Sequence, residues 1–325
     1  MSDARRRVLI TGVTGTVARQ LAEELLLDPT VEKVVGVDTG EEPYYFRDLD
    51  RRRFLFKRTN VLQRRELQNL FLADDLRDAR VDTVVHAAAA APGGGSAVEG
   101  TRLLLEWCEA LEHVRHVIYL SSWSVYHLRA SLGAHVNERA ELNFADDAPA
   151  SVQEQVDTDL ACRAAMDSES LQVAIVRAAP IVGRNINSPL NQLLESPFCP
   201  LLAGFDPMVN PIHARDVVGA LHRLVRRPQQ GIFNVAGKDV APLSFFARAA
   251  RCRRVTLPAP LLKPVARTMR RLKMTRFDER SGLEQLKYGC LLDTSRAREE
   301  LGFEPQFHIR FQPEAPTHVR RPKRR

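Results

Sequence analysis

The chain has 325 residues, of which 44% are hydrophobic, and a formal net charge of +7. This length and composition allow one sizeable core or two joined ones, and they exclude a small disulfide-stapled domain and a disordered, core-less chain. The charge does not point to a nucleic-acid binder, because five cations stand in the last six residues: Arg320, Arg321, Lys323, Arg324 and Arg325. We interpret residues 311–325 as a basic flexible tail that favours a solvated end over contact with nucleic acid or an anionic membrane.

Along the first half of the chain, short β-rich runs alternate with longer helical patterns. The predicted strands are residues 8–11, 34–37, 54–56, 83–86, 116–120 and 173–177, and the predicted helices are 16–27, 62–72, 98–111 and 156–166. This alternation predicts an α/β fold, a Rossmann-like doubly wound parallel sheet with right-handed crossovers.

The expected organisation has three parts. Residues 1–185 form the Rossmann-like core. Residues 186–310 form a mixed region, in which small substrate-cap segments accompany a helix and a strand near 212–236 that complete the core. The basic tail follows.

The five cysteines are widely scattered and include no Cys-x-x-Cys pair, which predicts reduced structural thiols rather than disulfides or a zinc site. No metal-ligand cluster is apparent among the nine histidines. With no leader pattern at the N-terminus and no apolar run of membrane-spanning length, we expect a cytoplasmic protein without a membrane span.

The first predicted strand runs into a glycine turn and a helix start, a pattern that receives a dinucleotide pyrophosphate. Gly12 permits a tight turn, Gly15 lets the backbone approach phosphate oxygens, and small Ala18 lets the helix pack closely on the strand. The helix N-terminus near Thr16 offers free N–H groups and a positive dipole end. The alternative is an ordinary glycine-rich turn between a strand and a helix.

The second strand ends at Asp38, where a carboxylate would meet the adenosine ribose hydroxyls of NAD. Glu41 and Glu42 follow, and no cation appears before Arg47. A 2′-phosphate would therefore meet repulsion, which favours NAD over NADP. The alternative for Asp38 is a solvated carboxylate at a strand end.

Several motifs in a characteristic order carry a family resemblance. They include Thr11-Gly12-x-x-Gly15-x-x-Ala18, Asp38, Asn60-Val61, Val84-Val85-His86-Ala87-Ala88-Ala89, Tyr119-Leu120-Ser121-Ser122, Val176-Arg177 and Ile212-His213-Ala214-Arg215-Asp216. Over about residues 7–237, with a weaker tail to about 307, the chain resembles the extended short-chain dehydrogenase/reductases of the NAD-dependent epimerase/dehydratase family.

The resemblance implies an NAD site formed by Gly12, Thr14, Gly15, Thr16, Val17, Asp38, Asn60, Val61, Ala87, Ala88 and Ala89. Family members act mostly on nucleotide sugars, so the implied partner is a small ligand of that class. They often form homodimers through the helices that flank the Ser and Tyr segments.

The resemblance also exposes a departure in the expected chemistry. The family uses a Tyr base whose pKa is lowered by a Lys four residues later, with a Ser or Thr hydroxyl that orients the substrate oxygen. Ser122 falls on the hydroxyl position, with a strand-end cap as the alternative for it, whereas Gln155 and Asp159 occupy the Tyr and Lys positions. Residues 127–169 contain no Tyr or Lys. We expect Asp159 to invert the local field and disfavour an anionic base.

Two functions remain open at this point. The first is an NAD(H)-binding protein that is catalytically degenerate or divergent and acts as a sensor or scaffold. The second is an active epimerase, dehydratase or reductase that uses other groups for its acid/base step. Among such groups, Tyr126 fits a packing role better than a catalytic one, and His127, His135 and Glu138 fit solvated loop positions.

A proline-started helical pattern follows residue 257, with Val265, Met269 and Leu272 expected inward and mostly basic residues outward. We interpret this segment as a solvated helix of the cap rather than as a membrane-docking helix.

Overall fold

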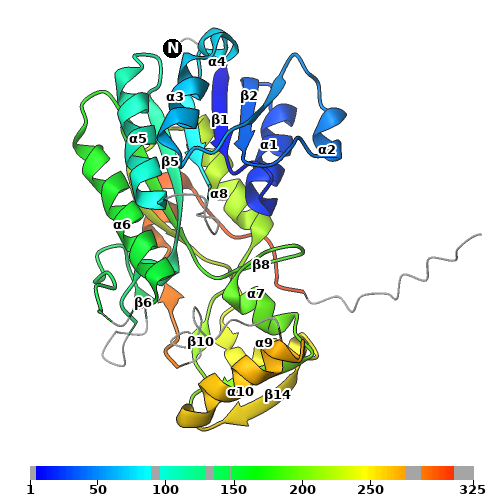
Figure 1. The fold of residues 1–325 in the computed structure, drawn as a ribbon. Coiled ribbons are helices and arrows are strands. Elements are labelled where there is room, and N and C mark those ends of the chain that lie inside the picture. The colour runs from blue at the N-terminus through cyan, green and yellow to red at the C-terminus, as the bar shows by residue number, and fades with distance from the viewer. Residues whose placement is uncertain (1–4, 89–95, 129–134, 147, 276–286, 311–325) are drawn as a thin grey trace, which may run out of the picture.

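The computed structural model describes residues 5–88, 96–128, 135–146, 148–275 and 287–310. Its centre is a seven-stranded sheet in the order β12-β7-β5-β4-β1-β2-β3, and every neighbouring pair is parallel (Figure 1). The strands are β1 (Arg6–Thr11), β2 (Val31–Asp38), β3 (Phe54–Arg58), β4 (Thr83–His86), β5 (His116–Ser122), β7 (Gln172–Ala178) and β12 (Gly231–Val235). The predicted doubly wound parallel sheet is confirmed.

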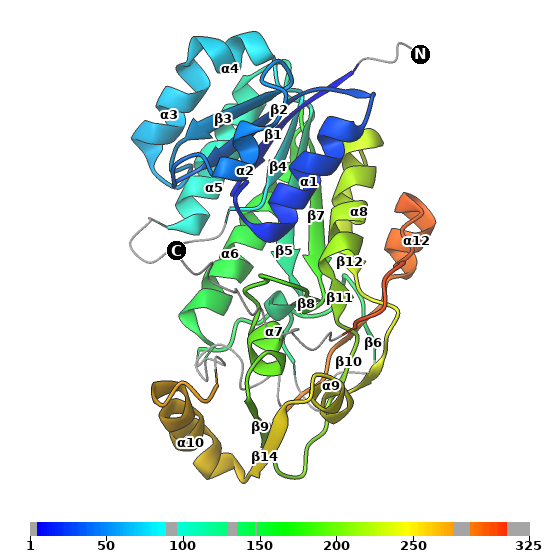
Figure 2. The ribbon, with the colours of Figure 1, turned by 90° about the vertical axis from the view of Figure 1, so that its right-hand side faces the viewer.

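Helices cover both faces of this sheet (Figure 2). On one face lie α1 (Thr16–Leu27), α8 (Ala214–Arg226) and α12 (Ser295–Leu301), and on the other α3 (Arg64–Leu72), α4 (Asp74–Ala79), α5 (Ala97–Ala110) and α6 (Ala150–Ala164). Strand β1 shows why two layers form: Val8 and Ile10 join the core beneath α1 and α8, while Leu9 joins the core beneath α3 and α5. Strands that are apolar on both sides need helices on both faces.

The described elements follow the predicted ranges with small shifts. Strand β4 and helix α1 have the predicted bounds, whereas α6 begins at Ala150 and not at 156. Its first turns are largely polar and exposed, so apolar periodicity is weak there, and Pro149 provides the helix start. The short helix α2 (Tyr44–Arg47) and helix α4 were not predicted.

A smaller group of elements lies beyond the carboxyl ends of the sheet strands (Figures 1 and 2). It contains α7 (Pro189–Leu194), β9 (Phe198–Leu202), β10 (Met208–Val209), β13 (Ala241–Pro242), α9 (Leu243–Ala249), β14 (Arg253–Leu257) and α10 (Ala259–Arg271). Strands β9 and β14 pair in parallel, and a separate hydrophobic cluster joins them to α7, α9 and α10. We call this group the cap.

Short pairs link the two regions. These are β6 (His135–Val136) with β15 (Leu291–Leu292) and β8 (Ile181–Val182) with β11 (Ile212–His213). The strand order reverses between β1 and β4, which is where open α/β sheets bind their ligands.

Candidate functional site

The glycine turn after β1 lies against the segment that follows β4. Gly12 has φ +68°, and a Cβ built there would come within 2.8 Å of the Ala88 Cα and 2.9 Å of the Ala87 carbonyl oxygen. At Gly15 a Cβ would lie 3.2 Å from the Gly12 carbonyl oxygen. Gly12 is therefore required twice, for its left-handed backbone and for the space beside Ala88.

The N-terminus of α1 follows the turn and has no side-chain cap. Gly15 is the N-cap residue, and it has no side chain to accept from the first N–H groups of the helix. Those groups suit an anion such as a pyrophosphate. Thr16 begins the helix and donates its hydroxyl to the Asn185 carbonyl oxygen at 2.7 Å, which ties this edge to the segment after β8. Val17 is buried.

The buried side chain of His86 is hydrogen-bonded to Thr11, the residue directly before the glycine turn. The Thr11 hydroxyl oxygen accepts the N–H groups of Ala87 and Ala88, each at 3.3 Å, and lies 2.7 Å from His86 Nδ1. The Thr11 proton must therefore go to Nδ1, which places the ring proton on Nε2, 2.9 Å from the Thr101 hydroxyl. Burial lowers the pKa of His86 to about 4, so the ring is neutral. The sequence showed His86 as a motif residue without indicating this role.

Asp38 lies at the end of β2 and holds the glycine turn. Its Oδ2 accepts the Thr14 N–H at 2.9 Å and the Thr14 hydroxyl at 2.7 Å, and its Oδ1 accepts the Thr39 N–H at 2.7 Å. Asp38 is thus fixed at the turn rather than simply solvated. The sheet also brings in a cation, because Arg58 is the register partner of Asp38. Its guanidinium donates to the Thr39 carbonyl oxygen and lies 3.8 Å from Glu41.

The observation that no cation appears between Asp38 and Arg47 holds along the chain, but it leaves out a cation on the neighbouring strand. The β2–β3 pairing places Arg58 beside Asp38 from twenty positions away.

The remaining cofactor candidates lie near the same edge. The Asn60 side-chain oxygen accepts the Leu62 N–H at 3.0 Å, while Val61 is buried. Leu62 sits tightly against α5, since a Cβ on Gly100 would come within 2.5 Å of the Leu62 Cα. Ala89 lies outside the described residues.

At the end of β5, the three predicted catalytic positions separate into two groups. Ser122 Oγ accepts the Ser124 N–H at 3.2 Å and lies 3.0 Å from Ser124 Oγ, which also contacts the amide oxygen of Gln155. The Ser124 hydroxyl has one proton, so it donates to only one of these oxygens at a time. Ser122 and Gln155 are thus connected through neutral groups.

Asp159 points away from this group, into the interior. Its carboxylate accepts two bonds from Arg177, at 2.5 and 3.0 Å, and one from the Ser121 hydroxyl at 2.8 Å. The side chains of Asp159 and Arg177 are both fully buried. Contrary to the expected inverted field, the charge of Asp159 is compensated by Arg177, a residue that the sequence motif contained without indicating the pair.

Arg177 extends this network across the sheet. It donates to the Tyr126 hydroxyl at 3.1 Å and to the Glu138 carbonyl oxygen at 3.3 Å. The Tyr126 hydroxyl donates to the Asn234 side-chain oxygen at 2.6 Å, and Glu138 accepts the Asn234 N–H. Burial is the largest influence on the pKa of Tyr126 and raises it to about 12. Tyr126 is therefore a packed residue, as expected. Glu138 is not a solvated loop residue, because it is hydrogen-bonded to Arg177 and Asn234.

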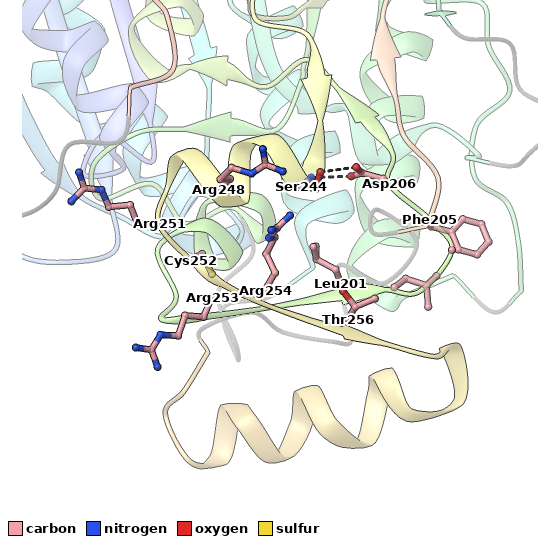
Figure 3. Close-up of a pocket in the computed structure, with 12 residues that line it drawn as sticks. Leu201, Phe205, Asp206, Ser244, Arg248, Arg251, Cys252, Arg253, Arg254 and Thr256 are labelled. Carbon is pink, nitrogen blue, oxygen red and sulfur yellow. Dashed lines mark hydrogen bonds between the residues drawn. The ribbon is translucent and has the colours of Figure 1, made fainter.

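The cap contains a separate cavity of about 810 Å³ (Figure 3). Its lining includes Arg248, Arg251, Arg253 and Arg254. Asp206 is the acidic residue of the lining, and its carboxylate accepts the Ser244 N–H and hydroxyl. No residue of the glycine turn or of the Ser122 group lines this cavity.

Within the described ranges, no group of three or more His, Cys, Asp or Glu side chains is arranged to hold a metal ion. None of the described helices combines the length and apolar character needed to span a bilayer.

A doubly wound sheet with a glycine turn and an uncapped helix at its switch point defines a dinucleotide-binding protein class. The family model described as the NAD dependent epimerase/dehydratase family matches residues 8–236. The chain belongs to this family.

Among curated proteins, the uncharacterized protein Rv0501 of Mycobacterium tuberculosis is 29% identical over 314 residues, which cover 92% of this chain and 80% of the relative. An uncharacterized protein of Mycobacterium bovis matches to the same extent. These relatives show that the likeness extends through the cap.

Two solved structures are similar in fold. A dTDP-glucose 4,6-dehydratase from Bacillus anthracis in complex with NAD has a TM-score of 0.70 and 14% identity, with 93% of this chain and 92% of that chain covered. A UDP-glucose 4-epimerase from Thermotoga maritima with UDP-glucose has a TM-score of 0.70 and 16% identity, with 93% and 94% covered.

Proposed function

We propose that this protein binds NAD(H) at the β1–α1 turn and is a catalytically degenerate or divergent member of its family, acting as a redox-responsive sensor or scaffold. The observation that carries the proposal is the composition of the catalytic position. Gln155 joins Ser122 through Ser124, and Asp159 is bound internally to Arg177. The family's base is a phenol whose pKa is lowered by a neighbouring ammonium group. The group formed by Ser122, Gln155 and Asp159 contains no such pair.

The cofactor assignment has support from several groups that act together. Gly12 and Gly15 leave room for phosphate oxygens, the first N–H groups of α1 have no side-chain cap, and Asp38 stands at the end of β2. Arg58 is engaged by Glu41 and by a backbone carbonyl, so we retain NAD over NADP. When bound, NAD(H) would supply hydride transfer. The residues of this chain would bind and orient it.

The ligand of the cap side is proposed by analogy with the two structural neighbours, which were solved with NAD and with UDP-glucose. A nucleotide sugar is therefore the small molecule to test first. Five buried free thiols suit a reducing compartment, in agreement with a cytoplasmic location.

The test has two stages on the full chain. NADH binding is titrated by fluorescence, with NADPH as the matched control, and turnover of the bound cofactor is then followed across a panel of nucleotide sugars. Tight NADH binding without turnover is the expected result. Absence of binding would remove the cofactor assignment.

An active enzyme is the second candidate, because the Ser122 hydroxyl keeps its place at the end of β5 beside a second hydroxyl. Turnover that disappears in Ser122→Ala and persists in Ser168→Ala, at a serine four residues beyond the end of α6, would favour this candidate. The same result would overturn the non-catalytic proposal.

A further inference from the structure

Helix α10 lies at the end of the cap farthest from the central sheet (Figures 1 and 2). One side of the helix packs against the rest of the protein, and its residues Leu262, Ala266 and Met269 are buried. Two leucines are not: Leu261 is 51% exposed and Leu272 is 65% exposed. The expectation that Leu272 faces inward was wrong. The helix ends at Arg271, and the chain then turns through a residue with positive φ, which leaves Leu272 at the C-cap outside the buried stripe.

The exposed side of α10 is divided into an apolar and a basic stripe. Leu261 and Leu272 are eleven residues apart, so the helical period places them on the same side, one at each end of the helix. Lys263, Arg267 and Arg271 follow one another at intervals of four and form the adjacent stripe. All five of these side chains are exposed.

The chain segment that contains this helix carries side-chain charges of one sign. Residues 240–275 contain nine cations and neither Asp nor Glu. The cations are Arg248, Arg251, Arg253, Arg254, Lys263, Arg267, Arg270, Arg271 and Lys273. The excess positive charge of the chain is therefore concentrated in the cap as well as in the last six residues. Such a surface attracts an anionic partner.

The sequence pattern favours a solvated helix of the cap, but the exposure of Leu261 and Leu272 favours the alternative, and we propose that α10 docks on an anionic phospholipid bilayer. The helix lies in the plane of the interface, with Leu261 and Leu272 among the upper acyl chains and the basic stripe against the headgroups. With thirteen residues the helix is far too short to span. The positive charge alone would fit a nucleic acid equally well. The two exposed leucines favour lipid, because the phosphates and sugars of a nucleic acid backbone provide no apolar surface for them to contact.

The test measures cosedimentation of the full chain with vesicles of phosphatidylcholine alone and with vesicles of equal parts phosphatidylcholine and phosphatidylglycerol. We expect binding to the mixed vesicles only, weakened by added salt. The pair Leu261→Ser and Leu272→Ser should reduce the affinity roughly tenfold or more, because the apolar contribution is lost. Replacing Lys263, Arg271 and Lys273 by Gln should reduce it at least as strongly, since each cation near an anionic surface contributes about a fivefold factor.

Matched controls lie on the Rossmann unit. Leu27 and Leu72 are 84% and 54% exposed there, and their replacement by Ser should leave vesicle binding unchanged. Thermal melting of all variants verifies that they fold. Because the five native cysteines are buried, a fluorescent environment-sensitive label on Leu272→Cys reports insertion, and the same label on Leu27→Cys is its control.

A blue shift of the label at position 272 with mixed vesicles, and none at position 27, supports the proposal. Failure of the wild-type chain to bind mixed vesicles at low salt would overturn it. Binding that is unaffected by the leucine pair, or binding to DNA in place of vesicles with the same charge dependence, would also overturn it. None of these measurements requires NAD, so their outcome is independent of the proposed function.

Discussion

Removing the guanidinium of Arg177 should destabilise the protein more than any surface substitution. In Arg177→Met the charge of Asp159 stays in the interior without its partner, since both side chains are fully buried. Breaking a buried pair in this way costs about 3–5 kcal/mol. A domain of this kind has a total stability of roughly 5–15 kcal/mol. The single variant is therefore expected to lose a large share of the stability of the fold.

The double variant Asp159→Leu with Arg177→Met should be milder than either single change. It leaves no buried charge, and the losses are the hydrogen bond from Ser121 and those from Arg177 to Tyr126 and Glu138. At about 1 kcal/mol each, partly regained by packing, the double variant should cost roughly 1–3 kcal/mol. The coupling between the two sites should then exceed about 2 kcal/mol.

Urea unfolding followed by tryptophan fluorescence measures all corners of this cycle. Glu23→Gln is the control, because it breaks an exposed pair with Arg19 at 2.8 Å and should cost under about 0.5 kcal/mol. Single variants at 159 and 177 within about 1 kcal/mol of wild type, or additive effects, would refute the reasoning. The same argument predicts that Asp159→Lys, which introduces the Lys that the family resemblance implies at this position, places a second cation beside Arg177 and fails to fold.

Three further outcomes are expected. Asp38→Ala should weaken NAD binding by roughly 1–3 kcal/mol in calorimetry, whereas Glu41→Ala should change it little; equal affinities in both variants would contradict the assigned ribose contact. Gly12→Ala should abolish NAD binding and lower stability by about 1–3 kcal/mol, because its Cβ would meet backbone at 2.8 Å, while Gly40→Ala, with open space around it, serves as control. The pKa of His86 is lowered from 6.5 to about 4, so between these values the unfolded state binds more protons and stability falls as the pH falls, by up to about 3 kcal/mol in total. Acid titration of unfolding should show a shallower fall in His86→Gln, and an unchanged slope would argue against the buried neutral ring.

Much of the fold was predictable because it depends on neighbouring residues. Strand β4 and helix α1 were predicted with the correct bounds, since an apolar run marks the strand and Asp28-Pro29 ends the helix. Helix α6 was predicted six residues too short at its start, where the polar first turns conceal the period. The position of Arg58 beside Asp38 was not predicted, because this neighbourhood follows from the register of β2 and β3.

The sequence alone determined the glycine turn, the alternation of strands and helices, and the lack of Tyr and Lys over residues 127–169. These are properties of local backbone preference and of residue identity. Tertiary structure decided that the charge of Asp159 is compensated by Arg177. The sheet register places Arg177 between Ser121 on one neighbouring strand and Asn234 on the other. It also decided that Leu272 meets solvent. Both outcomes depend on contacts between segments far apart in the chain, and a pattern of neighbouring residues carries no record of such contacts.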